Sequence, residues 1–311
     1  FSMWIASYMY GFNHDDPVNC ITRSGMLACF VIVILMSTIF SKKNGVKVLN
    51  FILVLGFLVS FFAYPLMWVS LGGKDPLQWL IVDFIMDTET RVYIILSWAL
   101  ALVLSLPILQ ASSKNFPRIV SRKLFHVLAV MMFLPVLYLD FNLLYFSLGI
   151  AASLMLLAEC TRVLRVFRIH EILSRYMLSF TDERDMGTIV LSHFYLLVGC
   201  AIPIWLVPRS VENVLPASAG ILSVGVGDAI AAVVGTFYGK TKWFDTKKSV
   251  EGTAAAAFLT SLLTMCLVSS EHYLSVTTFV TMTCLLETFT EQMDNLILPL
   301  YLFSLFSLLN E

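Results

Sequence analysis

The sequence predicts an all-α membrane protein, a bundle of about ten transmembrane helices of roughly 20 residues each. Of its 311 residues, 59% are hydrophobic and only 13% are charged, whereas about a quarter of the residues of a soluble domain are charged. The mean hydropathy is +0.85. The apolar residues also gather in long runs, and in lipid only helices or closed barrels satisfy every backbone hydrogen bond.

Ten of these runs are long enough, or nearly so, to cross a hydrocarbon core of about 30 Å. In chain order they occupy residues 24–40, 48–71, 92–111, 124–139, 141–158, 188–207, 214–237, 253–270, 273–286 and 296–310. Another apolar run, residues 1–10, opens the chain without an initiator Met. We expect it to be the end of a truncated span, because no charged segment of a signal peptide precedes it.

The loops between the runs indicate an orientation. Lys and Arg are enriched in cytosolic loops, and alternate loops of this chain hold 16 of its 20 basic residues. These loops are residues 41–47, 111–123, 161–187 and 239–251. We therefore assign them, together with residues 287–295, to the cytosol.

The composition also excludes several classes of protein. A chain with so little polar surface is neither secreted nor disordered nor a nucleic-acid-binding protein, and its net charge of −1 indicates no strongly charged partner. The six cysteines form no C-x-x-C pair. We expect free, mostly buried thiols rather than disulfides or a metal site.

The loop of residues 161–187 has the pattern of a helix that lies in the headgroup layer, because its arginines alternate with large apolar residues. It ends in an acidic cluster, Asp182-Glu183-Arg184-Asp185. Carboxylates next to anionic lipid are unfavourable unless they hold a cation or cap the next helix. Both interpretations of this cluster remain open.

Asp228 is the most informative single residue, because it lies within an apolar run. A carboxylate there costs about 2.5–3.5 kcal/mol on insertion scales and marks a functional site by default. It needs a partner. The small residues around it, Gly235 among them, allow close approach of a neighbouring helix or of a ligand, and the sequence does not distinguish the two.

The loop that follows has the chemistry of a polyphosphate site. It contains Gly239, Lys247-Lys248-Ser249 and Glu251-Gly252-Thr253. It is not a P-loop, because the glycine spacing is one residue short and no strand precedes it. Lysine charges, hydroxyls and the Gly252 amide at the start of a helix nevertheless suit phosphate. The alternative is a basic loop lying against anionic lipid.

Two further groups contain charged side chains near the ends of predicted spans. Glu287, Glu291 and Asp294, followed by Asn295, share one helical face; they either bind a divalent cation together with phosphate oxygens or are solvated loop acids. Arg122, Lys123 and His126 enter another span. In one interpretation, Arg122 and Lys123 extend toward the interface while His126 turns inward. In the other, Arg122 and Lys123 bind phosphate and His126 orients a hydroxyl.

Five segments together resemble the polyprenol kinase family, most closely its eukaryotic dolichol kinases. The segments, residues 122–126, 182–185, 226–229, 247–253 and 286–301, extend in order over most of residues 115–305. Two of them, around Asp228 and Lys248, are also similar to phosphatidate cytidylyltransferases. The Asp182–Asp185 cluster and the Asp-Asn-Leu segment that starts at Asp294 favour the lipid kinases.

The resemblance implies an activity, a location and a division of the chain. It implies phosphoryl transfer from CTP, with a divalent cation such as Mg²⁺, to the terminal hydroxyl of dolichol or another long polyprenol. The dolichyl phosphate formed would be the lipid carrier for protein glycosylation. The protein would be multi-pass in the endoplasmic reticulum membrane with its nucleotide site facing the cytosol. Residues 1–111 would be helices of unknown role, and residues 112–311 the catalytic domain.

The hypothesis gives each residue a role. Lys247 and Lys248 hold the β- and γ-phosphates with Ser249, Thr253 and the Gly252 amide. Asp228 and Asp294, with Glu287, ligate the divalent ion, or Asp228 instead accepts the proton of the lipid hydroxyl. The rival functions are cytidylyl transfer to phosphatidate and a transporter in which the same acids bind a coupling ion.

Overall fold

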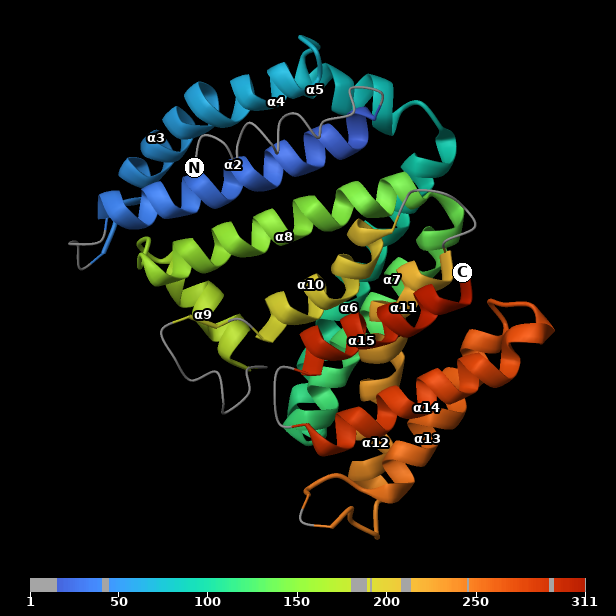
Figure 1. Ribbon diagram of the computed structural model, residues 1–311. Coiled ribbons are helices and arrows are strands. Elements are labelled where there is room, and N and C mark those ends of the chain that lie inside the picture. Colours follow the sequence, from blue (N-terminus) through green and yellow to red (C-terminus); the bar gives the residue numbers. More distant parts are fainter. Residues whose placement is uncertain are drawn as a thin grey trace. The chain divides into compact units, whose positions relative to one another are not determined.

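The computed structural model describes residues 16–40, 45–179, 189–190, 192–207, 214–244, 246–290 and 294–310. Within these ranges the chain is helical and contains no β-strand, which confirms the predicted all-α class (Figure 1). The helices in order are α2 (Pro17–Phe40), α3 (Val48–Leu58), η1 (Val59–Ala63), α4 (Tyr64–Ser70), α5 (Pro76–Gln78), η2 (Trp79–Ile85), α6 (Glu89–Asn115), α7 (Arg118–Leu139), α8 (Phe141–Val163), α9 (Ile169–Ser179), α10 (Ser192–Leu206), α11 (Val214–Gly220), η5 (Ile221–Asp228), α12 (Ala229–Phe237), α13 (Val250–Met265), η6 (Ser270–His272), α14 (Tyr273–Phe289), α15 (Asp294–Ser307) and η7 (Leu308–Asn310).

Each predicted apolar run overlaps a helix, but the count of ten spans is not confirmed. Among the described residues, five helical segments are long and apolar enough to cross a membrane. A sixth qualifies if Pro76–Ile85 and Glu89–Ser105, which are bent by 101° relative to each other, form one span. The five are Pro17–Phe40, Val48–Ser70, Ile119–Leu139, Phe141–Val163 and Val214–Phe237. Helices α10, α13 and α15 are apolar but have only 14 to 16 residues, fewer than the roughly 20 that a span needs.

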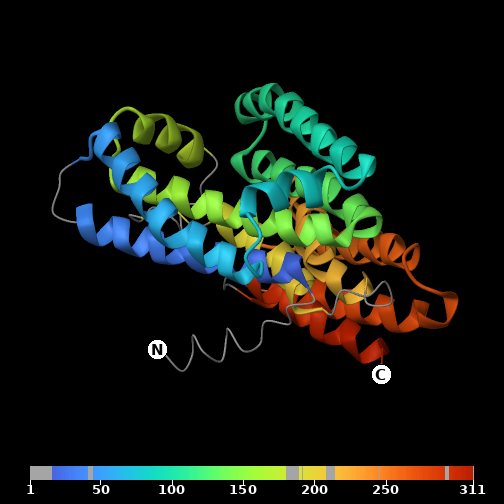
Figure 2. The same cartoon turned by 90° about the horizontal axis from the view of Figure 1, so that it is seen from above.

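The chain divides into two compact units, and the first comprises residues 1–94 and 146–194. Its core follows one face of α2, where Ala28, Ile32, Met36 and Phe40 recur every four residues and are buried. Helix α8 runs beside α2 (Figure 2), and the Cys29 thiol donates a hydrogen bond to the carbonyl oxygen of Ser153 on α8.

The long loop predicted at residues 161–187 contains a helix, α9, as its arginine pattern indicates. Near it, Glu159 is buried and accepts hydrogen bonds from Arg162 and from the Val190 amide. The acidic cluster Asp182–Asp185 lies outside the described residues, so its role stays a prediction.

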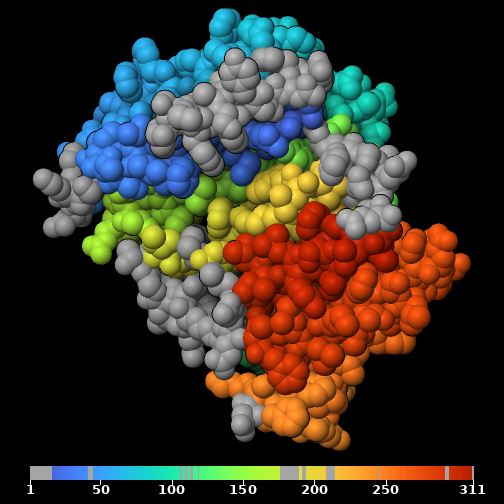
Figure 3. All heavy atoms as spheres, in the orientation of Figure 1, coloured from blue at the N-terminus to red at the C-terminus, as the bar shows by residue number. Residues whose placement is uncertain are grey.

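The second unit comprises residues 95–145 and 195–311. Helices α11, η5 and α12 form its central segment, which packs against α7, α13, α14 and α15. Leu222 on η5, Ala256 on α13, Val280 on α14 and Phe306 on α15 meet in a buried core. In Figure 3 the side chains of α14 and α15, orange to red, form a continuous surface of this unit.

Candidate active site

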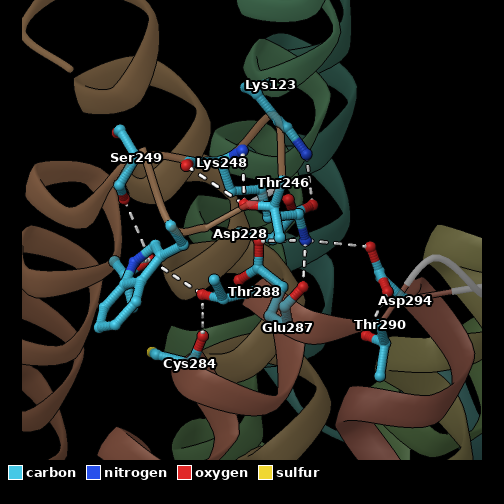
Figure 4. A network of polar contacts seen from close by, with 12 residues as sticks. Lys123, Asp228, Thr246, Lys248, Ser249, Cys284, Glu287, Thr288, Thr290 and Asp294 are labelled. Carbon is cyan, nitrogen blue, oxygen red and sulfur yellow. Dashed lines mark hydrogen bonds and ion pairs between the residues drawn. The ribbon is translucent and has the colours of Figure 1, made fainter. Parts of the chain in front are cut away.

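Five of the charged residues that the sequence predicts for a site, Lys123, Asp228, Lys248, Glu287 and Asp294, come together at one place (Figure 4). Lys123 comes from α7 and Asp228 from the last residue of η5, and the two are 105 residues apart in the chain. Lys248 lies just before α13. Glu287 lies in the last turn of α14, and Asp294 opens α15. Ends of five helical elements thus contribute to a single polar centre.

Lys123 is the partner that Asp228 needs. The two side chains form a hydrogen-bonded ion pair, and each is only 14% exposed. In one of the two sequence interpretations, Lys123 extends toward the membrane interface. Its ammonium is instead buried beside a carboxylate. A charge pair in this environment is costly to break, because either ion alone would remain buried without compensation.

His126 joins α7 to η5 beside this pair. Its Nδ1 atom lies 2.9 Å from the carbonyl oxygen of Val224 and 3.6 Å from a carboxylate oxygen of Asp228. A carbonyl oxygen only accepts hydrogen bonds, so Nδ1 carries the proton. His126 is therefore a buried contact between α7 and η5, and its role in orienting a hydroxyl stays a prediction.

Lys248 connects the second pair of carboxylates. Its Nζ atom lies 3.2 Å from Oε1 of Glu287 and 3.4 Å from Oδ2 of Asp294, and it also donates to the main-chain oxygen of Glu287. Burial acts to lower the pKa of Lys248, but the charges of Glu287 and Asp294 outweigh it and raise that pKa. Lys248 is therefore a cation at neutral pH.

The polar centre has more carboxylates than ammonium groups. Lys123 and Lys248 face Asp228, Glu287 and Asp294, so the five groups have a formal net charge of −1 when all are ionised. A polyphosphate is strongly anionic. It can bind here favourably only if a cation accompanies it and Lys248 redirects its charge from the carboxylates to the phosphates.

The donor atoms fit a hard divalent cation that is shared with a ligand. In the described parts of the chain no three His, Cys, Asp or Glu side chains form a ready-made metal site, because lysines stand among Asp228, Glu287 and Asp294. Mg²⁺ does not require such a site: it is usually held by one or two carboxylates together with waters and substrate phosphates. The predicted ligand set therefore stays a prediction.

The loop before α13 is folded back on itself by its own polar groups. The Val250 amide donates to the carbonyl oxygen of Thr241 at 3.0 Å, and the Trp243 amide donates to that of Lys248 at 3.2 Å. The Glu251 carboxylate accepts from the Thr241 amide. These bonds fix the backbone at Lys248, so its side chain is directed toward Glu287.

Ser249 caps α13. Its hydroxyl accepts a hydrogen bond from the Gly252 amide at 3.1 Å, and it is buried. The Gly252 amide, which the sequence analysis assigned to phosphate, is thus already used within the helix cap. Lys247, assigned to phosphate with Lys248, is exposed, whereas Lys248 is half-buried.

Glycines let α12 and the start of α13 approach closely. A Cβ atom at Gly252 would lie 2.6 Å from the carbonyl oxygen of Ala231, and one at Gly235 would lie 2.9 Å from the Ser249 hydroxyl. A Cβ at Gly239 would meet the same serine. Of the two interpretations of these glycines, helix packing therefore has a direct structural basis. Their assignment to nucleotide binding stays a prediction.

Two other predicted residues flank the centre. Arg122 precedes Lys123 on α7 and is half-buried. Asn295 follows Asp294 in the first turn of α15, and its carbonyl oxygen lies so near Gly199 on α10 that a Cβ there would not fit. Glu291 lies outside the described residues, so the predicted single acidic face is described only at Glu287 and Asp294.

Three residues that the sequence patterns did not indicate, Trp243, Thr288 and Thr290, support the site through hydrogen bonds. The Thr253 and Thr288 hydroxyls lie 2.9 Å apart, and the Trp243 indole donates to Thr253 at 3.2 Å. The Thr290 hydroxyl donates to Asp294 at 3.0 Å. Thr288 and Thr290 lie just after Glu287 in the sequence, and this position was the signal that could have identified them.

Asp228 ends a π-helical segment, η5, that the sequence analysis also missed. The wider turn lies between two α-helical segments of one continuous span, and such insertions are frequent at functional sites. Within it, Gly225 allows close contact with α7, because a Cβ at this position would lie 2.6 Å from Val130 Cγ2. The altered turn sets where the Asp228 carboxylate points.

Comparisons with known proteins identify the family. The sequence model described as dolichol kinase matches residues 6–218. The dolichol kinase EVAN of Arabidopsis thaliana is 35% identical over 276 residues, which are 84% of this chain and 48% of that protein. The dolichol kinase of Homo sapiens is 30% identical over 317 aligned residues, 93% of this chain and 59% of that protein. The dolichol kinase sec59 of Schizosaccharomyces pombe is 33% identical over 264 residues, 76% of this chain and 51% of that protein.

The chain thus spans about half the length of the curated relatives it matches. No solved structure matches it significantly. A match over 93% of the chain necessarily includes Asp228, Lys248 and Glu287, which lie beyond the region matched by the family model. The family model covers more than half of the chain, and this evidence establishes that the chain belongs to the dolichol kinase family.

Proposed function

We propose that this chain contains the site at which a nucleoside triphosphate, CTP, phosphorylates the terminal hydroxyl of dolichol or a related long polyprenol. The observation that supports it is the network in which Lys123 pairs with Asp228, and Lys248 with Glu287 and Asp294. Phosphoryl transfer asks a protein mainly to position the reactants and to neutralise charge. Family membership favours this activity over cytidylyl transfer and over transport.

Lys248 is the group that binds the transferred phosphate. Its ammonium contacts two carboxylates. When the triphosphate enters, the ammonium donates to the β- and γ-phosphate oxygens instead, and Lys247 approaches them from the exposed side of the loop. The folded loop from Thr241 to Val250 holds both lysines at one end of α13.

Asp228 is positioned to take the proton. The oxygen of the lipid alcohol attacks the γ-phosphorus, and the bond between that phosphorus and the β–γ bridging oxygen breaks. The bridging oxygen leaves with the electron pair as part of CDP, while the hydroxyl proton passes to the Asp228 carboxylate. Lys123, which donates a hydrogen bond to that carboxylate, holds it in place.

Glu287 and Asp294 are the carboxylates best placed to hold a divalent cation once Lys248 turns to the phosphates. Both have an oxygen within 3.4 Å of the same ammonium atom, so the two carboxylates converge on one point. Mg²⁺ bound there would offset the negative charge of the phosphates.

The choice of CTP, the endoplasmic reticulum membrane and a cytosolic nucleotide site are parts of the same proposal. The first two rest on the family resemblance. The third is supported by the basic loops, since residues 239–251, which contain Lys248, belong to the set rich in Lys and Arg. The product would be dolichyl phosphate, the carrier lipid for protein glycosylation.

The test is the activity of a Lys248→Ala variant in membranes that contain the full-length protein. We expect kcat/KM for CTP to fall roughly 10²–10³-fold, the usual cost of removing one preorganised donor from a charged transition state. Lys74→Ala is the matched control, because Lys74 is exposed and belongs to the other unit. Unchanged activity of Lys248→Ala would contradict the proposed site.

A further inference from the structure

A cavity of about 530 Å³ lies next to the polar centre, entirely within the second unit. Helices α6, α7 and α12 form its walls. Its apolar lining includes Ile108, Phe116, Leu124, Val127, Val233 and Phe237. This volume falls within the range of roughly 300–1,000 Å³ that is typical of small-molecule sites.

The walls of this cavity are held by specific contacts. The Ser112 hydroxyl on α6 donates to Ser121 on α7 at 3.1 Å, and the Trp98 indole on α6 donates to the carbonyl oxygen of Met132 on α7 at 2.9 Å. Phe116 meets Phe237 edge-on, with ring centroids 6.4 Å apart. The cavity is therefore a built feature of the packing between α6, α7 and α12.

One lining residue, Lys123, also belongs to the polar centre. Its ammonium forms the ion pair with Asp228, the proposed proton acceptor. Every other charged group of the centre lies outside the cavity lining. The cavity is thus apolar along its walls and charged at one point, beside the carboxylate where an attacking hydroxyl has to lie.

The cavity also opens toward the surroundings of the helices. Ile108, Phe116, Val127 and Phe237 each expose about half of their surface. Val127 and Phe237 belong to candidate membrane spans, whose exposed apolar surface faces lipid. A chain too long for 530 Å³ can therefore leave the cavity directly into the hydrocarbon layer.

We propose that this cavity binds the first isoprene units of the prenyl alcohol acceptor, with its hydroxyl at Lys123 and Asp228 and the rest of its chain in the bilayer. The inference rests on the proposed function, because it assigns the acceptor part of the same site. A phospholipid acyl chain has the same apolar chemistry but no terminal hydroxyl to donate to Asp228. Lys123 in the lining and its partner Asp228 therefore favour the alcohol over the acyl chain.

The first test narrows the cavity. Ala111 lines it and is exposed, so Ala111→Trp fills space without replacing a buried side chain. We expect the KM for the prenyl alcohol to rise by about tenfold or more, because a difference of one methylene in an apolar pocket already changes substrate preference by about tenfold or more. The KM for CTP should stay unchanged. Leu104→Trp, on an exposed part of α6 outside the lining, is the matched control.

The second test does not depend on catalysis. A prenyl alcohol with a photoreactive group on its first isoprene unit is irradiated with the wild-type protein in the absence of nucleotide. We expect cross-links at Phe116 or Phe237 that excess prenyl alcohol prevents and phosphatidylcholine does not. Cross-links elsewhere, or equal competition by phosphatidylcholine, would overturn the assignment.

The two proposals fail in different ways. If the wild-type protein phosphorylates the prenyl alcohol but Ala111→Trp leaves its KM unchanged, the cavity assignment is wrong and the proposed function stands. If the photoreactive alcohol labels the cavity but no phosphate is transferred from CTP, the proposed function is wrong and the acceptor cavity stands.

Discussion

Two lysines contact three carboxylates in this site, and the proposed function gives each lysine a different role. Lys123 keeps its ion pair with Asp228, and each of the two side chains is 14% exposed. Lys248 contacts two acids at once and is more exposed, at 33% of its side chain. The more accessible of the two ammonium groups is the one that can turn toward a phosphate. Its partners can then accept a cation in its place.

A first prediction separates the structural role of the Lys123–Asp228 pair from its chemical role. Asp228→Asn leaves the Lys123 ammonium buried without a compensating charge, so we expect a loss of up to about 3–5 kcal/mol in the free energy of unfolding. Adding Lys123→Met removes the unpaired charge, and most of the stability should return. Both variants should lack phosphoryl transfer.

Unfolding in detergent micelles and the transfer assay measure these two quantities on the same samples. A double variant with wild-type activity would show that neither side chain takes part in the chemistry. A double variant that remains as unstable as Asp228→Asn would show instead that packing, and not charge, accounts for the loss.

At the scale of the elements, the site depends on how closely the start of α13 approaches α12. Gly235, Gly239 and Gly252 surround the Ser249 hydroxyl, where Cβ atoms would not fit. This close approach of α12 and α13, the crossing, fixes the cap residue Ser249. It thereby also fixes Lys248, the residue before the cap. The polar groups of the motif, Ser249, Glu251 and Thr253, make hydrogen bonds within the protein. These bonds help to place Lys248, and the contacts of Ser249 and Thr253 with phosphate stay a prediction.

A second prediction tests this crossing. In Gly252→Ala the new methyl group would lie 2.6 Å from a backbone oxygen of Ala231, so the helices must separate at a cost of about 1–3 kcal/mol. We expect lower thermal stability and a higher KM for CTP, because Lys248 moves with the start of α13. Gly56→Ala is the matched control.

Gly56 lies in α3, and a methyl group added there would meet no atom within 4 Å. The same substitution at this position should be neutral or slightly stabilising, since alanine is a better helix former than glycine by roughly 1 kcal/mol. Equal effects of the two substitutions would contradict the proposed role of the crossing.

At the scale of the whole molecule, the sequence predicts the chemistry better than the number of spans. Charged residues are scarce, so Asp228, Lys248, Glu287 and Asp294 could be selected one by one, and the structure brings them together. The count of ten spans is not confirmed, because an apolar helix of 14 to 16 residues can be a buried core helix as well as a short span. Helices α13 and α15 have this length and help form the core of the second unit.

Other features leave no mark in a single sequence. The partner of Asp228 lies 105 residues away, and no local pattern specifies such a contact. The π-helical turn in η5 is a change in backbone hydrogen bonding, which side-chain hydrophobicity does not report. The cavity beside Lys123 arises where three helices meet, so its walls could be recognised only after those helices were packed.

In the proposed function, this site transfers the terminal phosphate of CTP to a prenyl alcohol. The most direct measurement supplies the full-length protein in membranes with dolichol and with CTP labelled at either the α- or the γ-phosphate, and then separates the lipid products. We predict that label from the γ-position appears in dolichyl phosphate and that label from the α-position remains in CDP. Label from the α-position in the lipid fraction, or no labelled lipid from either position, would contradict the account.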